Sequence, residues 1–398
     1  MITKTLLHII AFGIFCMFMI YCNYVELNEF VEKRNNLRLS QVRSVLQKLS
    51  KDSKNAKFND IPLVLIMCQN KGSIFQSSTA SGNRLQWQRQ KEQFKTLFGS
   101  LLYFSNLAQI RVLLFTDSAK TSAELLSSLA KWPRYQRSRL TFELHNIPTE
   151  MLHREQLMQW RPCAWAKMFL GEMLPDFDSV IYLDSDVVFL GPVEDLWDIF
   201  SKMNTSQSIA AGSEPWYVEE GRKRPAAGTY GINTGMLAMN LTRLRSAVDA
   251  GLGETLQNII VDQDPPPRHD QDALNIFLVD RPEMLHELSA RYNFIPSSCL
   301  KVAPKCKDCT EKGILVLHGA DSSFYRLVDA KSKDIYHILY EATDTLEDSL
   351  PQLLGKLEHQ MSYIDSQGSR FTFMCQHYEN YNQQLLHHAR AMVASTLS

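Results

Sequence analysis

The sequence predicts an α/β fold with a mostly parallel central sheet, preceded by a transmembrane helix at the N-terminus. Short continuous apolar runs, the pattern of strands buried on both faces, alternate with stretches of helical periodicity. Such alternation is typical of a parallel sheet that helices cover on both sides. The membrane helix is predicted from an apolar, uncharged run over residues 6–24, because about 20 such residues span a bilayer as a helix.

The apolar run from Leu6 to Tyr24 is interpreted as a retained signal-anchor. A cleavable secretory signal has a shorter apolar region and ends in small residues, whereas this run ends Met-Ile-Tyr-Cys-Asn-Tyr. A basic residue, Lys4, precedes the run and two glutamates follow it. The positive-inside rule therefore places residues 1–5 in the cytosol and everything after the run in the lumen.

The remaining chain divides by composition. Residues 25–60 are highly charged, with scattered apolar residues at helical spacing, and predict a stem. We expect a catalytic domain over 61–345 and a C-terminal helical extension over 346–398. The net charge of −1 gives no global field that would attract nucleic acid or anionic lipid.

The expected elements follow from the same patterns. In a sheet of this kind, ligands bind at the carboxyl ends of the strands, so these ends are where polar residues matter most. The expected strands are Ile61–Met67, Ile110–Phe115, Leu140–His145, Ser179–Leu183, Ile209–Ala211, Met236–Asn240 and Ile314–Leu317. The expected helices are Leu85–Phe104, Ala123–Trp132, Cys163–Leu174 and Asp272–Leu278, with further helix after residue 331.

Cysteines and sequons indicate an oxidising, glycosylating compartment. Of eight cysteines, six follow the apolar run, and an even number suits disulfides in a lumen. The pair Cys306 and Cys309 has the spacing of half a zinc site, but no second pair of ligands is suitably placed, so a disulfide is favoured. Asn204 begins the sequon expected to be glycosylated, whereas the sequon at Asn240 ends an apolar run and is expected to be too buried.

The strongest chemical signal is Asp184-Ser185-Asp186, directly after an expected strand. In extended backbone, residues i and i+2 face the same way, so both carboxylates would reach one point at the sheet edge. Mg²⁺ and Mn²⁺ commonly bridge carboxylates to substrate phosphates. A simple turn is the structural alternative. A phosphatase of the haloacid dehalogenase type is the chemical alternative, but Val187-Val188 follows where Gly-Thr or a similar pair is usual.

Three further polar segments follow along the chain. His318 ends another apolar run and is followed by Gly319. A lone histidine is more often a core residue, but here an imidazole nitrogen would join the same cation and favour Mn²⁺ over Mg²⁺. Asn233 precedes an expected strand. Asp270 and Gln271 open an expected helix, where capping is the alternative role for the aspartate.

Taken in order, these segments resemble glycosyltransferase family 8. They are the opening strand with Cys68, Ala166-Lys167-Met-Phe-Leu170, Asp184-Ser-Asp186, Asn233-Thr-Gly235, Asp270-Gln271-Asp272 with Asn275, and His318-Gly319. Finer features resemble its glucoside xylosyltransferase branch. They are Arg161-Pro-Cys163-Ala164, Phe189-Leu-Gly-Pro192-Val-Glu-Asp-Leu-Trp197, Met239-Asn-Leu-Thr-Arg243, and Tyr292-Asn-Phe294 with Cys299.

The resemblance implies a GT-A type, Rossmann-like fold, a UDP-sugar donor and transfer with retention at the anomeric carbon. It implies a metal site of Asp184, Asp186 and His318 for Mn²⁺, donor binding by Lys167, Asp184, Asp186, Asn233 and Gly319, and catalytic roles for Asp270 and Gln271. One departure is that His318-Gly319 lacks the Lys-Pro-Trp that follows in many members, so Lys331 or Lys333 is the nearest candidate for that lysine's role.

The branch adds xylose to O-linked glucose on epidermal-growth-factor-like (EGF-like) repeats in the secretory pathway. The resemblance therefore implies UDP-xylose and glucosylated EGF-like repeats as partners of a type II membrane protein of the Golgi or endoplasmic reticulum. Because Gln271 is a neutral amide and a poor nucleophile, we expect attack by the acceptor on the leaving-group side. The alternatives are a related member with another UDP-sugar or acceptor, such as a xyloside xylosyltransferase, and a catalytically silent member.

Overall fold

The computed structural model describes residues 61–69, 80–106, 109–148, 162–214, 226–262, 267, 269–299, 306–326, 329–367 and 380–397. All of them belong to one compact unit, Asn59–Ser398. The expected cytosolic tail, signal-anchor and stem, at 1–5, 6–24 and 25–60, lie outside the described residues. Among the helices that are described, none is long and apolar enough to cross a membrane.

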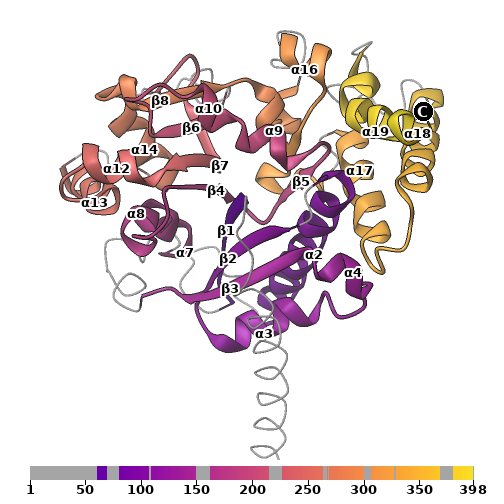
Figure 1. The fold of residues 1–398 in the computed structure, drawn as a ribbon, viewed down its shortest axis with the longest axis horizontal. Helices are drawn as coiled ribbons and strands as arrows, with labels where there is room; N and C mark the ends of the chain where they lie inside the picture. The colour runs from indigo at the N-terminus through magenta and orange to yellow at the C-terminus, as the bar shows by residue number, and fades with distance from the viewer. Residues whose placement is uncertain are drawn as a thin grey trace, which may run out of the picture. The chain divides into compact units, whose positions relative to one another are not determined.

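A seven-stranded sheet forms the centre of this unit (Figure 1). Its strand order is β3-β2-β1-β4-β7-β6-β8. Only β7 runs antiparallel to its two neighbours, and the other pairings are parallel. The expected mostly parallel sheet is therefore confirmed. Its strands are β1 (Ile61–Met67), β2 (Ile110–Thr116), β3 (Leu140–Asn146), β4 (Ser179–Leu183), β6 (Ile209–Ser213), β7 (Ile232–Asn240) and β8 (Leu285–Leu288).

Helices bury both faces of the sheet, which explains the continuous apolar strands. Leu63 and Leu65 of β1 lie in one apolar cluster with Phe98 of α2, whereas Val64 lies in a second cluster with Leu274 of α14. Burying one such side chain contributes about 1.5–3 kcal/mol. The helices are α2 (Ala80–Phe104), α3 (Ala119–Ser127), α4 (Arg134–Arg137), α7 (Pro162–Trp165), α8 (Leu170–Met173), α9 (Val193–Trp197), α10 (Ile199–Lys202), α12 (Leu241–Ala247), α13 (Leu252–Asp262) and α14 (Asp270–Val279). Short 3-10 helices are η2 (Ala166–Phe169), η3 (Pro282–Met284), η4 (Ala290–Tyr292), η5 (Pro296–Ser298) and η7 (Ala320–Ser322).

Two expected helices differ from those observed. The helix predicted from Ala123 begins at Ala119 instead, because the Ser118 hydroxyl accepts a hydrogen bond from the Thr121 N–H at 3.2 Å and caps it there. The helix predicted over Cys163–Leu174 is divided into α7, η2 and α8. Periodicity alone does not distinguish one helix from three short consecutive ones.

A second, two-stranded sheet was not predicted. It pairs β5 (Val187–Phe189) antiparallel with β9 (Val316–His318), outside the main sheet. The apolar run containing β9 was predicted as a strand over Ile314–Leu317, with no partner assigned. The sequence indicated its burial correctly, but strand pairing between residues so far apart in the chain cannot be read from periodicity.

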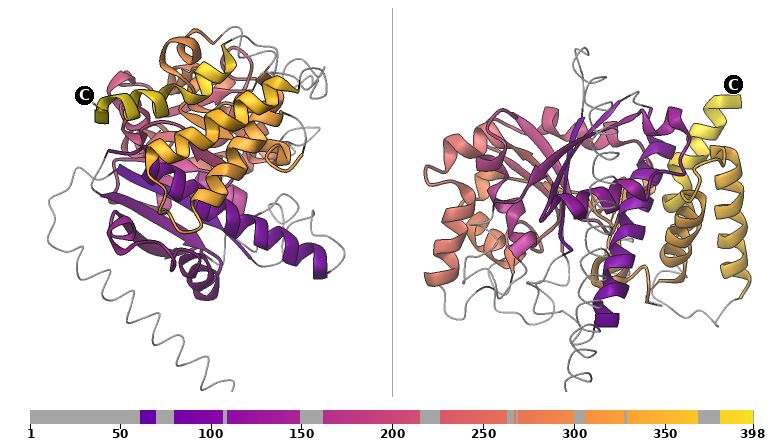
Figure 2. Two further views of the ribbon diagram at one scale, coloured as in Figure 1. Left: turned by 90° about the vertical axis from the view of Figure 1, so that its right-hand side faces the viewer. Right: turned by 90° about the horizontal axis from the view of Figure 1, so that it is seen from below.

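The last three α-helices among the described residues cover this small sheet. Figure 2 shows α17 (Ala330–Ala342), α18 (Leu350–Ser366) and α19 (Tyr381–Leu397), orange to yellow, grouped together beside α2. Leu353 of α18 and Leu385 of α19 belong to the same apolar cluster as Val188 of β5 and Leu317 of β9. The helical character expected after residue 331 is confirmed, and these helices form part of a core.

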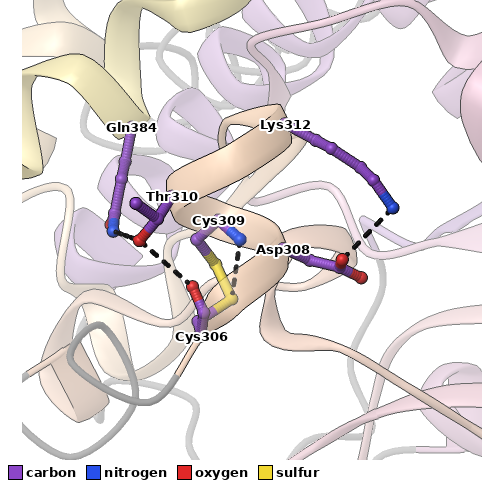
Figure 3. The surroundings of a disulfide bond; sticks show 6 residues. All are labelled: Cys306, Asp308, Cys309, Thr310, Lys312 and Gln384. Atoms are coloured by element: carbon purple, nitrogen blue, oxygen red, sulfur yellow. Dashed lines mark hydrogen bonds and ion pairs between the residues drawn. A yellow bond between two sulfur atoms is a disulfide. The ribbon is translucent and has the colours of Figure 1, made fainter.

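Disulfides join several of the cysteines. Cys68, just after β1, is bonded to Cys163 of α7, and Cys299 is also disulfide-bonded. Cys306 is bonded to Cys309 at the start of α16 (Lys307–Lys312), as Figure 3 shows. The disulfide preferred over a zinc site for this pair is therefore confirmed. Gln384 of α19 donates a hydrogen bond to the hydroxyl of Thr310, 2.9 Å away, which ties α19 to α16.

Candidate metal and donor site

Ser185 and Asp186 form a turn between β4 and β5, and Asp184 directly precedes it, so the two aspartates do not lie on one continuous strand. The reason given from the sequence for their convergence, that residues i and i+2 of a strand face the same way, was therefore wrong. The turn is held on both sides. The N–H of Asp184 donates to the carbonyl of Gly235 on β7 at 2.7 Å, and the carbonyl of Asp186 accepts from the N–H of Gly319 at 2.7 Å.

His318 reaches the aspartates through the small sheet. In the β5–β9 pairing it lies opposite Val187, and Val187 is the residue that follows Asp186. Its Nε2 is 3.4 Å from Oδ1 of Asp186. One ligand atom from each of Asp184, Asp186 and His318 lies within 4.8 Å of the others. Two carboxylates and one imidazole fit a divalent cation with a preference for oxygen and nitrogen ligands, and the three residues form a candidate site for such an ion.

His318 and Asp186 shift each other's pKa. Burial alone would lower the pKa of the His318 imidazole, but the hydrogen bond and charge of Asp186, with the charge of Asp184, outweigh burial and raise the pKa. Burial would raise the pKa of Asp186, but His318 lowers it. The carboxylates thus favour a positive charge at this point. A bound cation would supply that charge in place of the imidazole proton.

Tyr182 and Lys167 hold one carboxylate oxygen of Asp184. The Tyr182 hydroxyl donates to Oδ1 of Asp184, and Nζ of Lys167 is 3.5 Å from the same oxygen. Both of these contacts, made by residues that the structure describes, use Oδ1. Tyr182 was missed in the sequence, although it is two residues before Asp184.

Lys167 is buried, with its side chain only 3% exposed. Its ammonium lies 2.9 Å from Oδ2 of Asp270, and 3.2 Å from the carbonyl and from the hydroxyl of Thr234. Burial would lower the pKa of Lys167, but Asp184 and Asp270 outweigh it and raise the pKa. The lysine is therefore charged, and it links the first aspartate of the turn to the first residue of α14.

Asp270 and Gln271 begin α14, but they do not cap it through their side chains. His269 occupies the N-cap position without a side-chain cap bond. Oδ2 of Asp270 also accepts from the Thr234 hydroxyl at 3.1 Å. Oε1 of Gln271 accepts from Nδ2 of Asn233 at 3.2 Å and from the Thr234 N–H at 3.3 Å. This places the Gln271 amide nitrogen on the side away from these donors.

Asn233, which donates to Gln271, is buried, with 6% of its surface exposed. Besides Gln271, its Nδ2 donates to the Glu214 carboxylate at 3.0 Å, and its Oδ1 accepts from Nδ2 of Asn293 at 2.9 Å. Glu214 and Asn293 were not singled out in the sequence. Asn293 stands inside the Tyr292-Asn-Phe294 motif, which was the available signal. Glu214 directly follows β6, at a strand end.

The remaining sequence-predicted residues are placed as follows. Gly319 packs against Phe324, where an added Cβ would lie 2.3 Å from the ring. Lys331, one candidate for the missing lysine, is buried, with its ammonium 2.7 Å from Asp365. Asn204 is exposed after α10, whereas Asn240 is buried and caps α12 through its Oδ1. These positions leave the role of each residue a prediction.

Gly235 of β7 has no room for an added methyl group. A Cβ there would lie 2.1 Å from Cε1 and 2.7 Å from Nε2 of His318. We expect Gly235→Ala to displace the imidazole and weaken metal binding by at least roughly 10-fold, the lower range for disturbed ligand support. The measurement is the dissociation constant for Mn²⁺ as the probe ion, from the electron paramagnetic resonance signal of free Mn²⁺. Gly355→Ala on α18, where nothing lies within 4 Å of the added Cβ, is the matched control. Equal Mn²⁺ dissociation constants for the two variants would contradict the prediction.

Comparison with known proteins decides the family. The model of "Glycosyl transferase family 8" matches residues 104–319, more than half of the chain. The chain belongs to glycosyltransferase family 8. Glucoside xylosyltransferase 2 of Mus musculus is 31% identical over 279 residues, covering 66% of this chain and 60% of that protein. Glucoside xylosyltransferase 1 of Danio rerio is 31% identical over 251 residues, covering 58% and 60%. The matches thus span less than two thirds of either relative.

The fold of this family 8 glycosyltransferase also resembles a solved one. The crystal structure of the galactosyltransferase LgtC in complex with donor and acceptor sugar analogs matches with a TM-score of 0.50 at 17% identity. The match covers 71% of this chain and 96% of that one. The α/β, GT-A-like fold expected from the sequence is therefore confirmed for the described residues.

Proposed function

We propose that the chain is a retaining glucoside α-1,3-xylosyltransferase that moves xylose from UDP-xylose to O-linked glucose on EGF-like repeats. The convergence of Asp184, Asp186 and His318 within 4.8 Å carries the proposal, because a UDP-sugar transferase needs a charge centre for the donor diphosphate. The similarity to glucoside xylosyltransferases supports the choice of xylose and glucose.

The cofactor in this proposal is Mn²⁺, held by Asp184, Asp186 and His318. One imidazole among carboxylate ligands favours Mn²⁺ over Mg²⁺. When bound, the ion stabilises the negative charge that grows on the departing UDP. Asp184 and Asp186 would hold the ion where it can neutralise charge on the diphosphate. Lys167 balances the charge of Asp184 from the buried side, with its Nζ 3.5 Å from Oδ1.

The geometry around α14 supports transfer from the leaving-group side. Nζ of Lys167 lies 2.9 Å from Oδ2 of Asp270. Because this ion pair balances the charge of the carboxylate, Asp270 is a weak nucleophile. Gln271 is a neutral amide, and its nitrogen is suited to donate to a sugar hydroxyl. In this proposal both residues orient the sugar, and a UDP oxygen accepts the proton of the attacking hydroxyl. Trapping a covalent xylosyl-enzyme would overturn this part.

The proposed location is the lumen of the Golgi or endoplasmic reticulum. The disulfides Cys68–Cys163 and Cys306–Cys309 support an oxidising compartment. In this proposal the chain has a signal-anchor over 6–24, a stem over 25–60, a catalytic domain over 61–345 and a C-terminal extension over 346–398. It also includes glycosylation at the exposed Asn204.

A panel of donors tests the proposal. The full-length protein, with Mn²⁺, is incubated with UDP-xylose, UDP-glucose or UDP-galactose and a glucosylated EGF-like repeat. We expect kcat/KM for UDP-xylose to exceed the others by at least roughly 10-fold, since a pocket that excludes the C5 CH₂OH gains about that much discrimination.

Each outcome of the donor panel assigns a different function. Preference for another UDP-sugar would replace xylose in the proposal and leave the transferase class intact. Transfer to a xyloside instead of the glucosylated repeat would replace the acceptor. Neither transfer nor donor hydrolysis with any UDP-sugar would identify a catalytically silent member and overturn the proposal.

A further inference from the structure

We propose that Asn293 is a positioning residue that fixes the ring of His318, through a relay of two side-chain amides anchored on the backbone N–H of Gly235. The relay holds the histidine hydrogen on Nδ1 and leaves the Nε2 lone pair directed at the aspartates. The inference rests on the proposed function, because it assigns a role to His318 as a metal ligand.

The relay begins at a backbone N–H, which can donate a hydrogen bond but cannot accept one. The backbone N–H of Gly235 donates to Oδ1 of Asn233 at 2.9 Å. On the other side of the same amide, Nδ2 of Asn233 lies 3.0 Å from the carboxylate of Glu214, which accepts. A backbone N–H only donates and an ionised carboxylate only accepts. The Asn233 amide therefore has one allowed orientation.

The orientation of Asn233 determines that of Asn293. Because Oδ1 of Asn233 is an acceptor, the group that faces it at 2.9 Å is Nδ2 of Asn293. Oδ1 of Asn293 then faces Nδ1 of His318 at 3.0 Å. An amide oxygen accepts but does not donate, so Nδ1 carries the hydrogen.

The opposite nitrogen of the ring is the one at the metal site. Nε2 of His318 lies 3.4 Å from Oδ1 of Asp186. With the hydrogen on Nδ1, a neutral imidazole offers its lone pair at Nε2. Ligand histidines in metalloproteins are commonly oriented by a hydrogen bond at the other nitrogen, and losing that partner costs 10–100-fold in metal affinity.

The surrounding backbone is shaped for these two side chains. Asn293 is 2% exposed and His318 is 3% exposed. A Cβ added at Gly212 of β6 would lie 2.7 Å from the Cβ of Asn293. A Cβ added at Gly235 of β7 would lie 2.1 Å from the imidazole of His318. Phe294, next to Asn293, pairs with β9 through its N–H to the Val316 carbonyl at 2.9 Å. Two glycines thus make room for the ring and its amide partner.

Two substitutions separate positioning from simple packing. Asn293→Leu keeps the volume but removes the acceptor for Nδ1. Asn293→Asp keeps that acceptor but removes the donor to Asn233 and introduces a buried charge. Mn²⁺ affinity is measured for full-length protein with UDP present, from the electron paramagnetic resonance signal of free Mn²⁺, and thermal unfolding is recorded for each variant. Asn240→Leu, another buried asparagine at the far end of β7, is the control.

We expect Asn293→Leu to bind Mn²⁺ roughly 10–100-fold more weakly than wild type, and Asn293→Asp to stay within a few-fold of wild type. Asn240→Leu should lower the unfolding temperature but leave Mn²⁺ affinity unchanged. A packing role predicts the reverse order, with the buried charge of the aspartate variant doing more harm. An aspartate variant that folds like wild type but loses Mn²⁺ as fully as the leucine variant overturns the relay, as does a leucine variant with normal affinity.

The wild-type measurement separates the two proposals. Wild-type protein that binds no Mn²⁺ with UDP would overturn the proposed function, and this inference with it. Wild-type binding combined with an undisturbed leucine variant would overturn the relay alone.

Discussion

Replacing Asp186 by asparagine is expected to abolish sugar transfer. We expect kcat to fall by at least roughly 10³-fold, because a metal ion supplies several kcal/mol of charge stabilisation in the transition state. The fold should persist, since the side chain is partly exposed (26%) and the backbone carbonyl that accepts from Gly319 is unchanged. Transfer at saturating Mn²⁺ and the thermal unfolding midpoint are the two measurements.

The control for this substitution is Asp198→Asn. Asp198 is an exposed carboxylate at the start of α10, paired with Lys202 at 2.9 Å, and its loss should leave transfer unchanged. His318→Ala should reduce transfer less severely than the change at Asp186. Near-normal turnover of the Asp186→Asn protein in added Mn²⁺ would show that the metal site has been assigned wrongly.

Replacing Lys167 by methionine is expected to give the largest loss of stability near the site. The ammonium is buried between Asp184 and Asp270, and removing it leaves carboxylates without a counter-charge. Breaking a buried pair in this way costs about 3–5 kcal/mol. Urea unfolding measures the loss, and the KM for UDP-sugar should rise because Asp184 and Asp270 would separate.

A second substitution tests the cause of that loss. Adding Asp270→Asn to the Lys167→Met protein removes one uncompensated charge, so part of the stability should return, which a double-mutant cycle measures. Lys95→Met is the matched control: this lysine is buried on α2 and pairs with Asp344 at 2.7 Å. It should lose stability without a change in donor KM. If the double variant is no more stable than Lys167→Met alone, the charge argument is wrong.

The fold class was predictable because burial leaves a clear pattern. The continuous apolar runs of β1, β2 and β4 identify strands covered on both faces, and they were located almost to the residue. The small β5–β9 sheet was not predictable in the same way. Val187–Phe189 and Val316–His318 are each three residues long, and their pairing depends on contacts more than a hundred residues apart.

The candidate site was predictable in part for a chemical reason. Carboxylates and a histidine at the ends of apolar runs are unusual, so Asp184, Asp186 and His318 stand out. Tyr182, Thr234 and Asn293 do not, because each is an ordinary residue within a strand or loop. Their importance appears only in the hydrogen bonds that link them to charged neighbours, and these bonds depend on tertiary structure.

The position of α18 and α19 has a practical meaning for recombinant fragments. The family match ends at residue 319, yet Leu353, Leu385 and Leu386 share an apolar cluster with Leu317, the neighbour of His318. A fragment cut at the family boundary would expose that hydrocarbon surface to solvent and remove the support behind one candidate metal ligand. Recombinant fragments of this protein should therefore extend beyond α19. Substitutions in α19 should be tested for effects on cation binding.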